Sequence, residues 1–451
     1  MVRSKTKILM LLFIVGLTIA IFPVGVMACR MPRWRLMAGA YALPITPELN
    51  ATGYPIHPDG SPVYLAGFGD FGSRPAQSVH DDIYASCLIL NYDGTTIVFV
   101  ALDLIGFFID QVDIVRKEVE NNYGIDANNV IIACTHTHSG PDTLGLWNSW
   151  DPAPGVNWPY MRYVRNQTLE CISQAYQNME KAFIRFASTS VPELMKNARD
   201  EGRVYPDLEV MKVTNWRGKT IATMINYAGH PEVLWSDNLI LTSDYVGYLR
   251  DKVEEKLGGV VVFMNGALGG MITPDVEINE HTFEKAQEIG HKLAYATIRA
   301  LRSRRSYRLG AFFPFWKKTF NVEKRTFEVP LENYDFFLGM MGGILYRSDP
   351  WYKLPTVEFP MGTIMTEVNV ITIGKAQMIT MPGEVFPSIG YRLREAMTGK
   401  YKFQIGLGND ELGYIIPEDE WIEGEYEESM SVGVQTGIAM EAILMEMLEG
   451  T

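Results

Sequence analysis

The sequence predicts an α/β protein in which one large domain combines mixed β-sheets with flanking helices. After residue 80, segments rich in β-branched and aromatic residues alternate with segments whose apolar residues recur at helical spacing. The chain has 451 residues, 47% hydrophobic and 21% charged, which is typical of a globular protein with a sizeable core. We find no internal repeat or low-complexity tract, so residues 36–451 are expected to form a single domain.

The first half of this domain is expected to alternate hairpins, strands and helices. Residues 85–106 predict a hairpin, because two β-rich runs are joined by Tyr-Asp-Gly. Residues 111–124 carry apolar side chains at helical spacing and end in a glycine, as helices often do. A buried strand is expected in "NVIIACTHT", followed by a second amphipathic helix over residues 164–185.

The second half continues the alternation. Its expected elements are a hairpin (210–230), a helix (244–258), a strand (259–266), a helix (284–303) and a helix (385–398). Residues 310–380 are again rich in β-branched and aromatic residues. The overlapping stretch 305–365 contains many aromatic residues and prolines, and we expect it to form a covering subdomain.

The N-terminus predicts export. Three basic residues within the first seven precede an uncharged stretch, Ile8–Ala28, which a proline and a glycine interrupt near its end. A basic start followed by such a stretch is typical of a secretory signal or a membrane anchor. We therefore expect residues 1–35 to be a signal peptide or an N-terminal membrane anchor, and the protein to be membrane-anchored or secreted. The alternative is a buried core helix.

Charge and cysteine content exclude two classes of function. The formal net charge is −13, whereas a nucleic-acid-binding protein usually carries the opposite sign. The four cysteines include no CxxC pair, so neither a disulfide framework nor a thiolate zinc site is expected.

Polar residues at the ends of apolar runs mark the candidate site, because ligands of α/β proteins gather at the carboxyl ends of strands. The first stretch, "CTHTHSGPD", contains His136 and His138, which project to the same face if the segment is extended. The others are "INYAGHP", "ITMPGEVF" and "GNDELGYIIPEDEWIEGEYE". They contribute His230, Glu384, and the pair Tyr414 and Tyr426.

Together these residues suit zinc, which catalytic sites bind mainly through histidine nitrogen and carboxylate oxygen with one position left open. Bound zinc lowers the pKa of water and polarises a carbonyl, as amide hydrolysis requires. Each residue also has a structural interpretation. A histidine can simply pack in the core, and Glu384 can be a carboxylate favoured by a helix N-terminus.

The four stretches, in this order, resemble the neutral ceramidase family, the non-lysosomal zinc amidases that split ceramide into sphingosine and fatty acid. "THTHSGPD" is the most specific of them. "YALPITPELNATGY" and "HDDIYASCLIL" resemble the family's N-terminal region, so the resemblance spans about residues 38–430. It implies a ceramidase-like zinc amidohydrolase domain. The chain stops soon after the last motif, so the family's C-terminal immunoglobulin-like domain is not expected.

The resemblance implies a role for each residue. One zinc ion per chain would be bound by His136, His230, Glu384 and Tyr414. His138 would exchange protons with the attacking water or the leaving amine, and Tyr426 would donate a hydrogen bond to the developing oxyanion. Thr273 stands before a proline where the family has a serine, which keeps the hydroxyl but stiffens the side chain. Arg199 would contact the substrate.

The expected function is therefore zinc-dependent hydrolysis of the amide bond of ceramide or a related N-acyl lipid, at a membrane surface. One alternative is a zinc hydrolase of the same fold that acts on a soluble amide, peptide or ester. A second is a non-catalytic surface-binding protein on the same scaffold, which would lack either the metal or an open coordination position.

Overall fold

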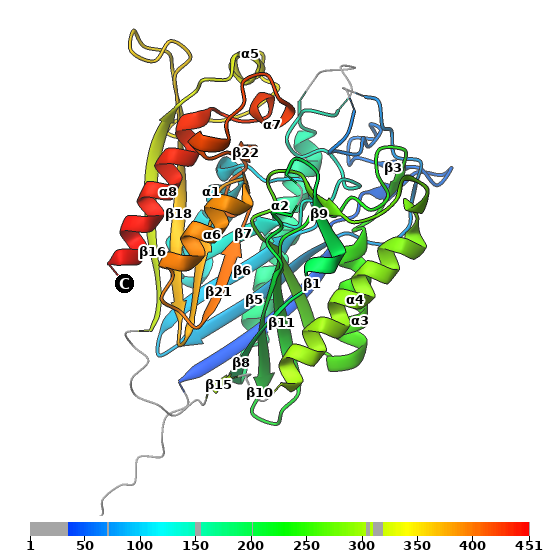
Figure 1. Cartoon of the computed structure of the whole chain (residues 1–451). Helices are drawn as coiled ribbons and strands as arrows, with labels where there is room; N and C mark the ends of the chain where they lie inside the picture. The colour runs from blue at the N-terminus through cyan, green and yellow to red at the C-terminus, as the bar shows by residue number, and fades with distance from the viewer. Residues whose placement is uncertain are drawn as a thin grey trace, which may run out of the picture. The chain divides into compact units, whose positions relative to one another are not determined.

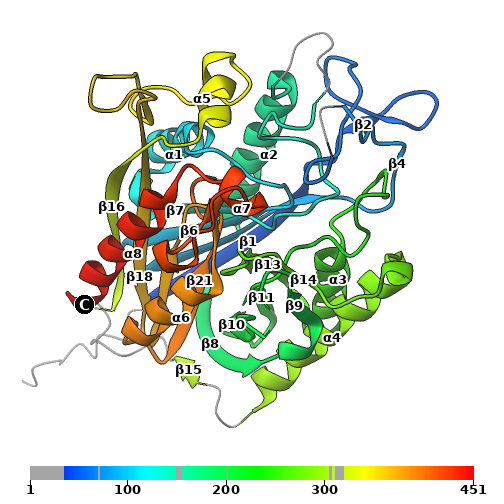
Figure 2. The same cartoon turned by 45° about the horizontal axis from the view of Figure 1, so that its top comes forward.

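Two β-sheets face each other across a layer of apolar side chains, and helices cover the outer face of each sheet (Figures 1 and 2). The computed structural model describes residues 35–69, 72–148, 155–200, 202–303, 307–309 and 319–450. Residues 34–451 form one compact unit. The stretch Ile8–Ala28 lies outside the described residues, and within them no helix is both long and apolar enough to span a membrane.

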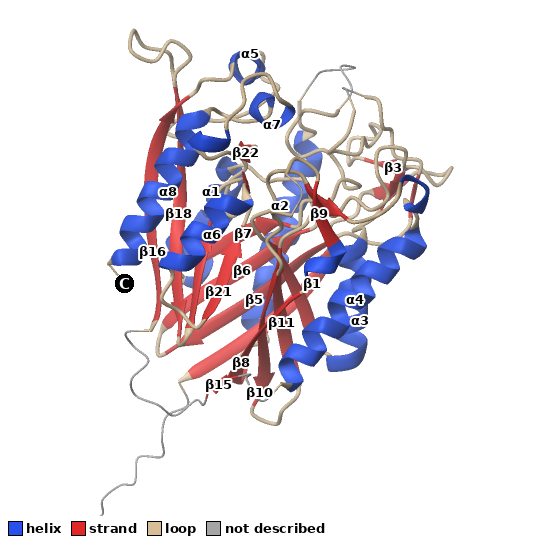
Figure 3. Ribbon diagram, viewed as in Figure 1, coloured by secondary structure: helices blue, strands red, loops and turns tan. Residues whose placement is uncertain are grey.

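The larger sheet has nine strands in the order β13-β11-β10-β8-β1-β5-β6-β7, with β15 beside β8. Figure 3 shows the strands in red and the helices in blue. Its strands are β1 (Leu36–Pro44), β5 (Tyr84–Tyr92), β6 (Thr95–Leu102), β7 (Val130–Cys134), β8 (Glu180–Ser190), β10 (Asp207–Asn215), β11 (Thr220–Tyr227), β13 (Val260–Asn265) and β15 (Tyr307–Leu309). Most neighbours are antiparallel, but β6 and β7 are parallel, as are β11 and β13. Helices cover one face and the second sheet the other, so central strands such as β5 are buried on both faces.

The second sheet has five strands in the order β16-β18-β19-β21, with β17 beside β18. They are β16 (Phe320–Pro330), β17 (Tyr352–Lys353), β18 (Thr363–Ile373), β19 (Ala376–Thr380) and β21 (Tyr401–Ile405). Short strands pair near the ends of the larger elements: β2 (Glu48–Leu49) with β3 (Pro55–Ile56), β4 (Ser78–Val79) with β12 (Ile240–Leu241), β9 (Met195–Asn197) with β14 (Ile272–Pro274), and β20 (Glu384–Val385) with β22 (Tyr414–Ile415).

Helices α1 (Ile109–Tyr123), α2 (Trp158–Gln177), α3 (Tyr245–Leu257) and α4 (Phe283–Arg302) contribute to the apolar cluster on the outer face of the larger sheet. Helices α6 (Pro387–Ala396) and α8 (Val434–Glu449) pack on the outer face of the second sheet. The short helices α5 (Tyr334–Met341) and α7 (Tyr426–Ser429) lie in the connections between the larger elements (Figure 2). This arrangement confirms the predicted class, an α/β fold with mixed sheets flanked by helices.

Two local predictions need correction. The helix expected over residues 164–185 begins at Trp158, where the Asn157 side chain accepts a hydrogen bond from the backbone of Tyr160, and it ends at Gln177. Residues 180–190 form β8 instead, because their alternating side chains pack into the sheet. Within 310–380, where β structure was expected, residues 334–341 form α5, capped by the side chain of Asn333.

The expected covering subdomain, residues 305–365, lies partly outside the described residues. The described part supplies β16 and β17 to the second sheet and α5 to the connection between them. Whether it acts as a subdomain stays a prediction.

Candidate metal centre

The candidate residues converge where several strands end. His136 follows β7, His230 follows β11, and Glu384 and Tyr414 are paired residues of the parallel strands β20 and β22. Asn265, the last residue of β13, holds two of these segments together. Its amide nitrogen donates to the carbonyls of Thr135 and Gly229, at 2.8 and 3.0 Å, and its amide oxygen accepts from the backbone of Gly229. Asn265 therefore fixes the residue that precedes each of the two histidines.

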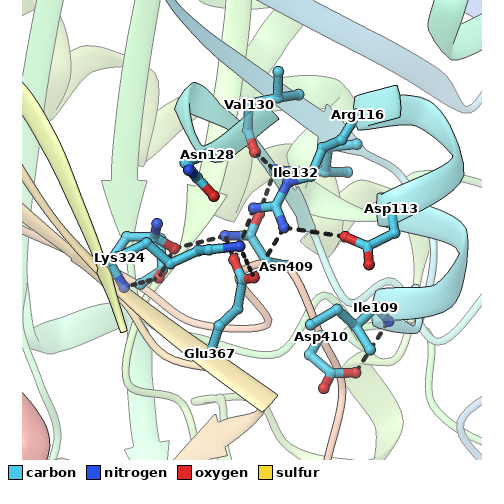
Figure 4. A network of polar contacts seen from close by, with 12 residues as sticks. Ile109, Asp113, Arg116, Asn128, Val130, Ile132, Lys324, Glu367, Asn409 and Asp410 are labelled. Carbon is cyan, nitrogen blue, oxygen red and sulfur yellow. Dashed lines mark hydrogen bonds and ion pairs between the residues drawn. The ribbon is translucent and has the colours of Figure 1, made fainter. Parts of the chain in front are cut away.

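A second buried network holds the loop before Tyr414 against β7 (Figure 4). Asn409 adopts a positive φ of 68° and exchanges two hydrogen bonds with the backbone of Ile132. Its amide nitrogen also donates to Glu367, which accepts two hydrogen bonds from Arg116. Arg116 in turn donates to the carbonyl of Val130. The network thus links the strand that leads to His136 with the loop that leads to Tyr414.

The backbone around the His-Thr-His step is not extended, contrary to the expectation from its spacing. β7 ends at Cys134, and His136 has a positive φ of 69° while its N–H donates to the carbonyl of Leu104. The two rings still lie close, with centroids 4.9 Å apart and planes at 75°. They converge because the chain turns, and not because alternate residues of a strand share a face.

His136 and His230 have the same hydrogen-bonding arrangement. The Nδ1 atom of His136 lies 2.6 Å from the carbonyl oxygen of Ile105, and that of His230 lies 2.8 Å from the carbonyl of Ile272. A carbonyl can only accept, so each ring donates through Nδ1. Both Nε2 atoms face Glu384, at 3.5 and 3.0 Å from its Oε2. Donation through one nitrogen leaves the other suited to a metal, as is usual for histidine ligands.

His138 has different surroundings. Its Nδ1 lies 3.2 Å from Oε2 of Glu232, and neither of its ring nitrogens has a hydrogen-bond partner. Glu232 is buried and its Oε1 is also unpartnered. The nitrogens of His136, His138 and His230 nevertheless lie within 4.8 Å of one another, so these three histidines could also bind one metal ion.

Sequence reasoning missed Glu232 and Asn265. Glu232 stands two residues after His230 in "GHPEV", and a carboxylate at that spacing was the available signal. Asn265 ends an apolar strand run and could have been found by the strand-end argument applied to the histidines. Both are buried polar residues that contact the predicted site or the segments that carry it.

The two tyrosines lie side by side, with ring centroids 6.1 Å apart. Tyr414 is buried and its hydroxyl donates to the sulfur of Met271 at 3.3 Å. Burial and the nearby Glu384 carboxylate raise the pKa of Tyr414 well above its usual value. Tyr426 begins α7 and is half-exposed, and partial burial together with Glu384 raises its pKa to about 12. Both phenols are therefore hydrogen-bond donors at neutral pH.

Thr273 and Arg199 flank this cluster. Thr273 is buried in β14, and its hydroxyl interacts with the carboxylate of Glu232. Arg199 donates to both oxygens of Glu428, at 3.0 and 2.7 Å, and lies 3.1 Å from Glu427. Both carboxylates belong to α7, so Arg199 anchors the helix that begins at Tyr426. Its predicted contact with the substrate stays a prediction.

Burial and mutual charge shift the pKa values of the cluster in opposite directions. Burial would lower the pKa of His230, but Glu232 and Glu384 outweigh it and raise the value to about 9. Burial would raise the pKa of Glu384, and the nearby histidines lower it strongly. Burial and the neighbouring histidines lower the pKa of His138 well below its usual value. His138 is thus favoured as a neutral ring, which can accept a proton.

The cluster lies between two hollows. The outer cleft, about 580 Å³, is lined on its polar side by His138, His230, Glu232, Tyr414 and Tyr426. The inner cavity, about 60 Å³, is reached by His136, Arg347, Glu384 and Glu411 and is otherwise lined mainly by apolar side chains: Ile105, Phe108, Leu144, Leu146, Trp147, Phe336, Met340, Leu345, Leu412, Met430 and Val432. Leu146, Trp147 and Met430 line both. His136 and His138 thus face different compartments.

These residues fit a zinc ion. Two histidine nitrogens and a carboxylate, all buried, are the donors that catalytic zinc prefers. The carbonyl partners of both Nδ1 atoms supply the supporting hydrogen bonds that metal-binding histidines usually have. The unpartnered polar atoms of His138 and Glu232 beside them indicate a place for a further polar group, since such atoms are seldom left unsatisfied in a protein interior.

The fold and this cluster define an α/β protein with a buried histidine–carboxylate centre suited to a metal ion. Residues 60–268 match the family model described as neutral/alkaline non-lysosomal ceramidase, N-terminal. The match confirms the resemblance to the neutral ceramidase family that the motifs predicted, and it supports a hydrolase.

Two solved structures have the same fold. A crystal structure of neutral ceramidase from Pseudomonas aeruginosa matches with a TM-score of 0.72 at 17% identity, over 92% of this chain and 74% of that chain. A ceramidase complexed with C2 matches with a TM-score of 0.71 at 17% identity, over 92% of this chain and 75% of that chain. At this level of identity the likeness concerns the fold.

Proposed function

We propose that the protein is a zinc-dependent amidohydrolase that hydrolyses the amide bond of ceramide or a related N-acyl lipid. The observation that carries the proposal is the convergence of the Nε2 atoms of His136 and His230 on the carboxylate of Glu384. These three residues and Tyr414 would hold one zinc ion per chain. Zinc in such a site polarises the amide carbonyl and lowers the pKa of water.

The residues of the outer cleft would handle the protons and the developing charge. His138 faces the cleft as a neutral ring next to Glu232, so it can take a proton from water and pass it to the leaving amine. Glu232 would orient this ring and stabilise its charged form. Tyr426 lines the same cleft with its phenol protonated and would donate a hydrogen bond to the carbonyl oxygen as negative charge develops there. Thr273 would act through Glu232, which its hydroxyl contacts.

Two observations support a lipid substrate: the apolar lining of the inner cavity, directly beside His136 and Glu384, and the family match. An apolar pocket next to a few convergent polar groups is the usual form of a site for such a molecule. We further propose that the chain is exported and acts at a membrane surface, on the basis of the basic and apolar stretch at its start.

A second candidate is hydrolysis of a soluble amide, peptide or ester at the same centre. The observation in its favour is the small volume of the inner cavity, about 60 Å³, together with the carboxyl of Glu411 in its wall. A long alkyl chain would need this cavity to open.

Product release from a substrate panel distinguishes these candidates. Purified full-length protein should release fatty acid from ceramide faster than it cleaves N-acyl amino acids or short peptides. Preferential cleavage of the soluble substrates would favour the second candidate. Cleavage of none, by protein that contains zinc, would favour a non-catalytic protein.

A further inference from the structure

The inner cavity contains a carboxyl group that the proposed reaction does not use. Glu411 is buried, and its Oε1 accepts a hydrogen bond from the backbone N–H of Gly413 at 2.9 Å. Its Oε2 is inaccessible to bulk water and has no hydrogen-bond partner. An unsatisfied polar atom in a protein interior is unfavourable, so a group that pairs with it stabilises the complex.

The position of Glu411 is fixed relative to the candidate metal centre. The carbonyl of Gly413, whose N–H bonds Glu411, accepts a hydrogen bond from the N–H of Glu384 at 2.9 Å. On the other side, Gly106 allows close approach, because a Cβ atom at that position would lie 2.9 Å from Cγ of Glu411. The carboxyl thus lies in the same small cavity as His136 and Glu384, on a backbone shared with the centre.

The neighbouring cation does not pair with Glu411. Arg347 also lines the cavity, but it forms its ion pair with Asp410 and lies over the ring of Phe108. Asp410 is further held by the hydroxyl of Thr366 and the N–H of Ile109. Arg347 therefore makes its ion pair without Glu411, and Oε2 of Glu411 stays without a partner in the wall of the cavity.

We propose that Glu411 determines substrate specificity by forming a hydrogen bond with a hydroxyl group of the amide substrate. This hydroxyl lies close to the scissile bond. The inference rests on the proposed function. A hydroxyl both donates and accepts, so it pairs with this carboxyl in either protonation state. A cationic group would instead meet Arg347, and the metal when bound, in the same cavity. The cavity is small, about 60 Å³, and is lined by His136 and Glu384 of the candidate metal centre, so the hydroxyl lies near the amide and not far along a chain.

Matched substrate pairs test this proposal with the full-length protein. The first pair places a hydroxyl on the acyl side: it compares the hexanoyl and the 2-hydroxyhexanoyl amides of one alkylamine. The second pair places a hydroxyl on the amine side: it compares the same hexanoyl amide with the hexanoyl amide of the matching 2-amino alcohol. The two pairs show on which side of the amide the hydroxyl lies. We expect wild type to favour the hydroxylated member of one pair by about 10-fold or more in kcat/KM, because a polar site left unpaired rejects the analogue that lacks the group.

Three variants locate the effect. Glu411→Leu should reduce the preference to about two-fold or less and Glu411→Gln should keep most of it, since only the amide can still hydrogen-bond. Leu412→Met reshapes the same wall without a polar change and should alter both members of each pair alike.

Equal rates on both members of both pairs by wild type would overturn the proposal, as would a preference that persists in Glu411→Leu. If Glu411→Leu fails to fold, the proposal is still tested by the other two proteins: wild type must prefer the hydroxylated substrate, and Glu411→Gln must keep most of that preference. If wild type cleaves none of the three amides, the proposed function fails, and this inference fails with it.

Discussion

Arg116 and Glu367 form a two-pronged ion pair in the interior, with nitrogen–oxygen distances of 3.0 and 2.8 Å. The guanidinium comes from α1, which packs on the larger sheet, and the carboxylate comes from β18, a strand of the second sheet. The pair therefore joins the two halves of the fold. Asn409 connects it to the loop that leads to Tyr414, and Val130 connects it to the strand that leads to His136. The ion pair therefore helps to position the candidate metal centre, although neither of its residues contacts the proposed metal ligands.

Glu367→Gln should destabilise the protein by about 3 kcal/mol or more, because it leaves the buried charge of Arg116 without a counterion. Urea-induced unfolding at neutral pH measures this loss. Glu446→Gln, which removes the partner of Arg325 in an exposed pair, is the matched control and should have little effect. Equal unfolding midpoints for wild type and Glu367→Gln would contradict the role of the pair.

The same pair predicts a dependence on pH. Burial raises the pKa of Glu367, but Arg116 and Lys324 outweigh it, and the net shift is downward. A carboxyl whose pKa is lower in the folded state contributes stability that is fully present above its unfolded value, about 4.3, and is lost as the pH falls through the folded value. The difference in unfolding free energy between wild type and Glu367→Gln should therefore shrink below about pH 4. A difference that grows on acidification would contradict this sign.

Asn265→Ala should weaken zinc binding by about 10-fold or more, since residues that orient metal ligands typically contribute that much. The substitution leaves the carbonyls of Thr135 and Gly229 without their donor and frees the segments before His136 and His230. Titration with a competing chelator measures the affinity. Asn91→Ala, at the turn of the β5–β6 hairpin, is the control and should keep the wild-type affinity. A similar loss in both variants would indicate a general effect on stability.

Gly269→Ala should displace Glu384 and reduce both zinc content and activity. An added Cβ would lie 2.4 Å from the carbonyl oxygen of Glu384 and 2.7 Å from the carbonyl carbon of Val385, distances that require the backbone to move. Gly450→Ala, where the nearest atom lies 3.7 Å away, is the control and should behave as wild type. Full zinc content in Gly269→Ala, measured by elemental analysis, would show that Glu384 is not held by this contact.

The sequence was sufficient to predict the fold class, the helices α1 to α4 and α6, and several strands of the larger sheet, because strands buried on both faces and amphipathic helices leave clear periodicities. It did not predict α8 or the individual strands of the second sheet. It placed His136, His230 and Glu384 at strand ends, and the structure brings them together. It could not show the positive φ of His136, because that conformation depends on a hydrogen bond to Leu104.

The remaining gaps concern contacts between residues far apart in the chain. Two examples are the contact between Glu232 and His138 and the lack of a hydrogen-bond partner for Oε2 of Glu411, which both depend on tertiary packing. The start of α2 was placed several residues late, because the capping by Asn157 was not recognised.

The most direct test of the central claim is the zinc content of purified full-length protein and two variants. We predict about one zinc per chain in wild type, loss of the metal in His136→Ala, and retention of the metal with loss of amide hydrolysis in His138→Ala. The reason is that Nε2 of His136 faces Glu384, whereas His138 faces the outer cleft beside Glu232. Absence of stoichiometric zinc in wild type, or equal loss of metal in both variants, would contradict the account.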